Sequence, residues 1–185
     1  TISTKDNSLK ELKINKKPNE DLGLVFELAV FDKVISCNNK CIFCFVDQQP
    51  KGLRETLYVK DDDYRLSYLQ GTYITLTNLK EPDKKRIEQL RLGPLYISVH
   101  TTNPDLRVKM LKNPKAAEIM SSLTWLNNLY IPMHTQIVLC PGFNDGAELE
   151  KTLKDLSHLD NVVSVAIVPV GITIYRKEKD LKPLT

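Results

Sequence analysis

Three cysteines lie within eight residues of this chain, at Cys37, Cys41 and Cys44, with the spacing C-x3-C-x2-C. Thiolate is the preferred protein ligand of iron-sulfur clusters, which usually take four such ligands. A compact set of three predicts a four-iron cluster with one iron left open for another ligand. Three thiols this close in sequence are a poor set for disulfides, so they indicate a metal site in a reducing compartment.

Zinc is the alternative metal for these thiols. A structural zinc site normally takes four cysteine or histidine ligands. The nearest further candidates, Cys140 and His100, are remote from the cluster of thiols in the sequence. A zinc-stabilised binding domain therefore stays open as a second interpretation of the three cysteines.

The composition narrows the class of protein. The chain has 185 residues with a formal net charge of +3, which is enough length for a full core and too little charge to argue for a nucleic-acid groove. No apolar run approaches the ~20 residues of a membrane-spanning helix, and residues 1–7 are polar rather than signal-like. We expect a cytoplasmic protein with no membrane partner and no indicated nucleic-acid partner.

Apolar runs rich in β-branched residues alternate with helical patterns, which is typical of βα units around a parallel sheet. We predict strands over residues 73–77, 95–100, 135–139 and 162–168, with an earlier one within 24–35 that leads into the cysteines. We find no internal repeat.

Helices are predicted between these strands. Pro82 suits the start of a helix that carries Ile87 and Leu90, and Pro114 suits the start of another. Asp145 and Glu148 form a capping-box pattern before a further helix. A helix is also predicted over residues 61–70, where three aspartates either cap the helix start or ligate a metal; we favour capping.

Strand parity predicts where the site lies, because successive side chains of a strand point to opposite faces. Leu95, Ile97 and Val99 share an apolar face, whereas Ser98 and His100 share a polar one. Helices must cover the apolar face, so the polar face turns inward. We therefore predict an α/β fold, a partial (β/α)6-type TIM barrel with outer helices, incomplete in this chain, with its site at the carboxyl ends of the strands.

Several polar residues have positions that bear on this site. Gln136 faces inward on its strand, within reach of a ligand, whereas His134 begins that strand and belongs to the opposite end. His158 lies at a helix end and has no predicted site role. Cys140 is either a second metal ligand, a radical relay or a small buried hydrophobe, and we favour the last.

Cys37, Cys41 and Cys44, with aromatic Phe43 before the last cysteine, resemble the C-x3-C-x-aromatic-C signature of radical S-adenosylmethionine (SAM) enzymes. Residues 44–54 and 58–66 are similar to one bacterial subfamily of iron-sulfur oxidoreductases with no assigned substrate. In that subfamily a PDZ-like segment precedes the radical domain and another domain follows it. The resemblance implies an N-terminal segment or linker over residues 1–20 and a radical SAM domain over residues 21–185. With Thr1 in place of Met and about five βα units instead of six, we expect a piece of a longer protein.

The resemblance also implies the cofactors and their contacts. Relatives bind a [4Fe-4S] cluster and SAM, cleave SAM with one electron from a donor such as a flavodoxin or ferredoxin, and abstract hydrogen from a substrate, unknown here. Phe43 would flank the adenine, or pack under the loop. Thr77 and Asn78 stand where relatives have a Gly-Gly-Glu segment that binds the methionine amino group. Ser98 and His100 stand where relatives contact ribose or carboxylate, although His100 is equally well read as structural.

An electron-transfer or structural iron-sulfur module, which binds a cluster without cleaving SAM, is the remaining alternative. Such a module needs no cavity beside its cluster. A polar cavity next to the cysteines therefore separates an enzyme from an electron carrier.

Overall fold

The computed structural model describes residues 2–3, 9–10, 13–23, 25, 29–30, 32–176 and 179–184. The chain divides into two compact units, residues 1–31 and 32–185. In the first unit, β1 (Ile2–Ser3) pairs with β2 (Leu9–Lys10) in antiparallel register. All that follows concerns the second unit, which holds the three cysteines.

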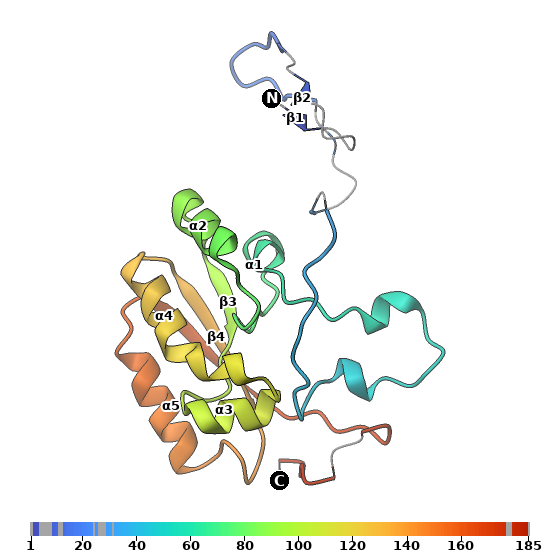
Figure 1. Cartoon of the computed structure of the whole chain (residues 1–185), viewed down its shortest axis with the longest axis vertical. Coiled ribbons are helices and arrows are strands. Elements are labelled where there is room, and N and C mark those ends of the chain that lie inside the picture. Colours follow the sequence, from blue (N-terminus) through green and yellow to red (C-terminus); the bar gives the residue numbers. More distant parts are fainter. Residues whose placement is uncertain are drawn as a thin grey trace. The chain divides into compact units, whose positions relative to one another are not determined.

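A parallel sheet forms the centre of the second unit (Figure 1). Its order is β3 (Leu95–Ser98), β4 (Met133–Leu139) and β5 (Val162–Pro169). Ile74 adds one parallel bridge to Ile97, so the predicted strand over residues 73–77 joins the sheet at a single point. The result is a partial α/β fold with outer helices, as predicted, and not a closed barrel.

Helices precede and connect the strands of this sheet (Figure 1). They are α1 (Tyr64–Gln70), α2 (Glu81–Leu90), α3 (Pro104–Leu111), α4 (Ile119–Asn128) and α5 (Ala147–Ser157). Short 3-10 helices span Val46–Gln48, Glu55–Tyr58 and Pro114–Glu118. Helices α3 and α4 lie between β3 and β4 in the chain and α5 between β4 and β5, as parallel pairing requires. Among the described residues no helix has the length and apolar character needed to span a membrane.

The apolar face of the sheet is covered by helices, as strand parity predicted. Leu95, Ile97 and Val99 are fully buried in one core, together with Leu123 of α4 and Leu156 of α5. Each such side chain removes apolar surface from water, which contributes about 1.5–3 kcal/mol on burial. Helix α2 contributes Ile87 alone, since Leu90, which we expected on its buried face, is 63% exposed.

Two predicted helix starts are wrong. Helix α1 begins at Tyr64 instead of residue 61, because Asp63 is the N-cap and its carboxylate accepts from the Arg65 N–H at 3.0 Å. Helix α5 follows Gly146 and has no side-chain cap. Asp145 instead accepts from the Gly142 N–H at 3.0 Å, so the predicted capping box is not formed.

Two further differences concern whole elements. Helix α3 was not predicted, because the buried Arg107 interrupts its apolar pattern. The predicted early strand falls partly on residues 24, 26–28 and 31, which lie outside the described residues. Residues 32–35 are not in a strand, and Ser36 makes only an isolated antiparallel bridge to Asp61.

Candidate functional site

The three cysteines lie on an irregular loop, residues 37–44, whose backbone is tied to two neighbouring segments. The Cys37 N–H donates to the Lys60 carbonyl at 2.8 Å. The Lys40 and Ile42 N–H groups donate to the carbonyls of Leu111 and Met110, at 3.0 and 2.9 Å. The last carbonyls of a helix have no partner within the helix, so α3 supplies the acceptors that this loop needs.

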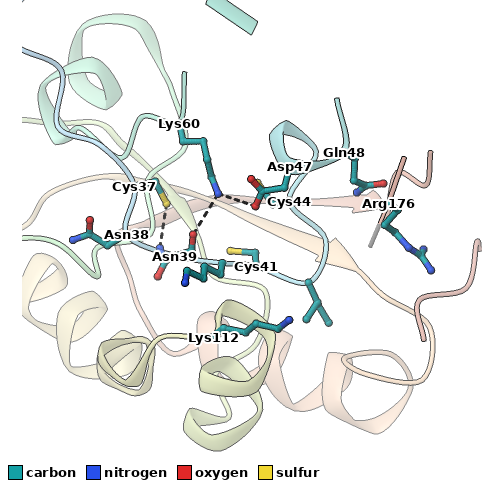
Figure 2. Close-up of a pocket in the computed structure, with 12 residues that line it drawn as sticks. Cys37, Asn38, Asn39, Cys41, Cys44, Asp47, Gln48, Lys60, Lys112 and Arg176 are labelled. Atoms are coloured by element: carbon teal, nitrogen blue, oxygen red, sulfur yellow. Dashed lines mark hydrogen bonds and ion pairs between the residues drawn. The ribbon is translucent and has the colours of Figure 1, made fainter. Parts of the chain in front are cut away.

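Two cavities share the walls formed by Cys37, Cys41, Cys44 and Lys60. The first, which we call the inner cavity, has a volume of about 560 Å³ and reaches the polar face of the sheet. The second, the outer cavity, has about 570 Å³ and is lined by loop residues and by Lys112 and Arg176 (Figure 2). The cysteines therefore line both cavities.

Four of the predicted cofactor residues line the inner cavity. They are Phe43, Ser98, His100 and Gln136. Three of these come from the strand face that parity assigned to the interior. The cavity also has apolar and aromatic walls, including Tyr73, Val138 and Val168. A volume of this size with a few polar groups is typical of small-molecule sites, which measure about 300–1,000 Å³.

Thr77 and Asn78, the other two predicted cofactor residues, line neither cavity among the described residues. The Asn78 amide donates to the Asp62 carbonyl at 2.8 Å. The Thr77 hydroxyl donates to the Asn39 Oδ1 at 3.1 Å. Both side chains thus hold neighbouring segments in place, and their contact with a cofactor stays a prediction.

Asn39 is the buried centre of a hydrogen-bond network beneath the cysteine loop. Its side-chain amide donates to the hydroxyls of Thr75 and Thr77 at 2.9 and 3.0 Å, and to the Cys37 Sγ at 3.4 Å (Figure 2). Its Oδ1 accepts from the Asn113 amide at 2.7 Å. Because buried polar groups are costly when unpaired, this network holds Asn39 in one orientation.

Asp62, two residues after Lys60, anchors the same network from outside the cysteine loop. Its carboxylate accepts from the Thr75 N–H and from the Thr75 hydroxyl, each at 2.6 Å. Burial raises the pKa of Asp62, which the two hydrogen bonds from Thr75 oppose. Of the three aspartates at residues 61–63, one therefore caps a helix and another supports the loop.

Arg107 supports the site from α3 and is 1% exposed. Its guanidinium donates to four backbone carbonyls at 2.8–3.0 Å, those of Thr75, Ser98, Val99 and Ala116. Burial lowers the pKa of Arg107 to about 10, so the group stays charged at neutral pH. One side chain thereby links the end of β3 and the segment at Thr75 to the helix that supports the loop.

His100 is held in one tautomer at the inner cavity. Its Nδ1 accepts from the Val138 N–H at 3.1 Å, so the proton of the neutral ring is on Nε2. The ring packs on Phe43 with 4.5 Å between centroids. Burial lowers the pKa of His100 to about 3, and its backbone has a φ of 66°, a left-handed conformation rare for non-glycine residues. The ring is therefore a neutral hydrogen-bond donor.

Two of the thiols, Cys37 and Cys41, are protonated in the protein alone. Burial raises the pKa of Cys41 to about 12, with a further contribution from the neighbouring Cys37 and Cys44. Burial also raises the pKa of Cys37. The thiolate, not the thiol, is the form that binds metal. A cationic centre would therefore have to displace these protons when it binds to the cysteines.

Lys60 is the charged group that both cavities share. Its ammonium donates to the Asp47 carboxylate at 2.8 Å and to the Asn39 carbonyl at 3.4 Å (Figure 2). Burial lowers the pKa of Lys60, but the hydrogen bond to Asp47 and the negative charge of that carboxylate contribute to raising it overall. A positive charge is thus present beside the thiols at neutral pH.

The donor set suits a cluster better than a single ion. All four cysteines are free, and within the described part of the chain no group of three or more His, Cys, Asp or Glu side chains is arranged to hold one metal ion. In an iron-sulfur cluster each thiolate binds a different iron, so the ligands need not converge on one point. Three free thiols on a wall shared by two cavities fit that requirement.

The remaining sequence candidates, Cys140 and His134, pack against neighbouring side chains. Cys140 is fully buried in a second apolar core with Ile42 and Phe43, as expected for a small hydrophobe. His134 stacks on Tyr96, with 4.8 Å between ring centroids. Neither residue lines the inner or the outer cavity among the described residues.

Sequence reasoning missed Asn39, Lys60, Asp62 and Arg107. The aspartates at residues 61–63 are predicted at a helix start, which is right only for Asp63. The local signal for α3, and so for Arg107, is Asn103 followed by Pro104, an N-cap and a first-turn proline. Nothing local distinguishes Asn39 from the exposed Asn38 beside it.

One comparison with known proteins identifies a family that this chain matches. A family profile described as "Radical SAM-like domain" matches residues 16–166, which is most of the chain. The match includes the three cysteines, all of β3 and β4, and β5 except its last three residues. No curated protein matches the chain.

Proposed function

The chain belongs to the radical SAM family, and we propose that it is an enzyme domain that cleaves SAM reductively and uses the product to abstract hydrogen from a substrate. The observation that carries the proposal is the inner cavity, which shares its wall with Cys37, Cys41 and Cys44. A protein that only transfers electrons needs no such space beside its thiols.

Cys37, Cys41 and Cys44 would hold three irons of a [4Fe-4S] cluster, with the fourth left for SAM. When bound, this cluster supplies the electron that breaks the sulfonium bond of SAM. The protein's part is to bind and orient SAM and to exclude water from a reactive intermediate. Burial of the loop against a second core, through Ile42 and Phe43, supports that role.

The inner cavity offers the polar groups for orientation. The His100 Nε2–H is available to donate to a ligand acceptor, because Nδ1 is already engaged with Val138. Ser98 and Gln136 add a hydroxyl and an amide on the same sheet face. Phe43 supplies an aromatic surface next to the cysteines. These groups bind a neutral, polar ligand portion such as a ribose without adding charge.

The test is anaerobic reconstitution with iron and sulfide, followed by reduction with dithionite in the presence of SAM and chromatography for 5′-deoxyadenosine. We expect a brown protein and accumulation of the product. Cluster binding without product would favour an electron-transfer module. A colourless protein that retains zinc would favour the binding-domain alternative.

Cysteine variants identify the ligands. Cys37→Ala, Cys41→Ala and Cys44→Ala are each expected to lose the brown colour and the product. The matched control is Cys140→Ala, which removes a buried thiol that lines neither cavity among the described residues. We expect that variant to keep both. An active triple variant of the loop cysteines would contradict the proposal.

A further inference from the structure

Asn39 contacts one of the three loop thiols directly. Its side-chain amide nitrogen lies 3.4 Å from the Cys37 Sγ, within hydrogen-bond distance for sulfur (Figure 2). Among the described residues, neither Cys41 nor Cys44 accepts a hydrogen bond from a side chain. The three thiols therefore differ in their surroundings, and the difference depends on which end of the Asn39 amide faces Cys37.

Asn113 fixes the orientation of that amide from one side. The Asn113 Oδ1 accepts from the Lys115 backbone N–H at 3.0 Å, so the other branch of the Asn113 side chain is its nitrogen. This nitrogen donates to the Asn39 Oδ1 at 2.7 Å. Because the oxygen of Asn39 is thereby assigned, the branch next to Cys37 is the nitrogen, and it carries two protons.

A second chain of hydrogen bonds gives the same orientation independently. The Asp62 carboxylate accepts from the Thr75 N–H and from the Thr75 hydroxyl, each at 2.6 Å. A hydroxyl has one proton, so a Thr75 hydroxyl that donates to an ionised Asp62 can only accept from Asn39. The Asn39 atom that lies 2.9 Å from the Thr75 Oγ1 is therefore the amide nitrogen. Two separate segments thus direct an N–H donor at Cys37.

The burial of Asn39 gives this donor its electrostatic weight. Asn39 is 2% exposed, so water does not compete for its amide. Away from water, a hydrogen bond to a charged acceptor is stronger than at the surface. Hydrogen bonds to the sulfurs are among the factors that set the reduction potential of an iron-sulfur cluster, because they stabilise the added negative charge of the reduced state.

We propose that Asn39 is a positioning residue that raises the reduction potential of the iron-sulfur group held by the loop cysteines, through the hydrogen bond from its side-chain amide to the Cys37 Sγ. The inference rests on the cluster of the proposed function and is independent of SAM cleavage. On reduction, a chemical reductant such as dithionite loses one electron and the iron-sulfur group gains it. The amide proton stays on Asn39, and no covalent bond forms or breaks.

The test is a redox titration of the reconstituted protein without SAM. The midpoint potential is read from the visible absorbance and from the electron paramagnetic resonance signal of the reduced cluster. Asn39→Ala removes the donor and should make reduction about tenfold less favourable, which is a fall of about 59 mV for a one-electron couple. The midpoint does not depend on the fraction of molecules that hold a cluster, so a lower iron content does not hide the shift.

A second variant and a matched control separate the donor from the network. Asn39→Asp keeps the shape of the side chain and an acceptor for Asn113, but an ionised carboxylate has no proton for the sulfur, so its midpoint should fall at least as far. Asn113→Ala removes a hydrogen bond from the same network and leaves the contact between Asn39 and Cys37. Its free energy of unfolding should fall while its midpoint stays that of the unmodified chain, because Thr75 still orients Asn39.

Each outcome decides between a role in the potential and a role in structure. Equal shifts in Asn39→Ala and Asn113→Ala, or an unchanged midpoint in both Asn39 variants, would overturn the proposal. Loss of the cluster in both Asn39 variants but not in Asn113→Ala would overturn it too, because Asn39 would then be needed for assembly. A brown unmodified chain that shows the shift but forms no 5′-deoxyadenosine would contradict SAM cleavage alone. A colourless unmodified chain would contradict the proposed cluster itself.

Discussion

The cysteine loop and the sheet are held in place by different forces. The apolar face of the sheet is a continuous core, with Leu95, Ile97 and Val99 fully buried. The first half of the loop depends on directional hydrogen bonds made by Asn39. The second half depends on Ile42 and Phe43, which pack into a smaller core.

This difference separates stability from positioning. Apolar burial is roughly proportional to area and is not directional, so it stabilises the fold without specifying where a sulfur atom points. Hydrogen bonds depend on distance and angle, so a network can fix the orientation of a loop. We therefore expect core substitutions to change the free energy of unfolding, and network substitutions to change what the loop binds.

The largest expected effect is on the core. Leu123→Ala should lower the free energy of unfolding by about 2–5 kcal/mol, because it leaves a cavity at a fully buried site. Urea titration measures the change. The iron content per folded molecule should stay unchanged. Leu90→Ala makes the same replacement at a 63% exposed site and should cost under about 0.5 kcal/mol.

The next effect depends on pH. The folded pKa of His100, about 3, lies below its ordinary value of 6.5, so the unfolded chain binds the proton more readily. Stability from this group is present above pH 6.5 and is lost as the pH falls toward 3. Between pH 7 and pH 5 the loss is about 2 kcal/mol.

Urea titrations of the unmodified chain and of the His100→Asn variant, each at pH 7 and pH 5, isolate the contribution of His100 to the free energy of unfolding. Asparagine tolerates a positive φ, and its Oδ1 can accept the Val138 N–H in place of Nδ1. We expect the variant to lack the loss of about 2 kcal/mol. An identical pH dependence in both proteins would mean that His100 is not buried as a neutral ring.

The network gives a smaller change in stability with a different consequence. Asn39→Ala should cost about 1–2 kcal/mol, because it leaves buried partners unpaired. Iron retained after reconstitution should fall more than stability does, since the loop loses its fixed orientation. Asn38→Ala is the neighbouring control, and its side chain is exposed. Equal iron retention in both variants would show that the network does not position the loop.

The smallest expected effect is at the surface. Asp47→Asn removes the ion pair with Lys60, and exposed pairs contribute about 0–1 kcal/mol, so the free energy of unfolding should barely change. Urea titration measures the change. A loss well above about 1 kcal/mol would contradict a solvent-screened pair.

Local sequence features predicted the elements that depend on local physics. The alternation along residues 95–98 placed Ser98 at the inner cavity, because the period of a strand is a property of the backbone. His100 also lines that cavity, but it follows the end of β3 and has a left-handed backbone, which the alternation did not predict. Pro82 stands in the first turn of α2, as predicted. The capping box at Asp145 failed because its carboxylate is engaged within the preceding turn.

The sequence by itself determined the three-thiol motif and the strand faces. Three thiols at C-x3-C-x2-C and an alternating strand need no other part of the chain to be recognised. The tertiary structure decided which polar residues surround the thiols. Asn39 meets Asn113, and Lys40 lies beside the end of α3, across some seventy residues of chain. Such pairs depend on the path of the whole chain, because hydrogen bonds and charges act on distance in space and not on spacing in sequence.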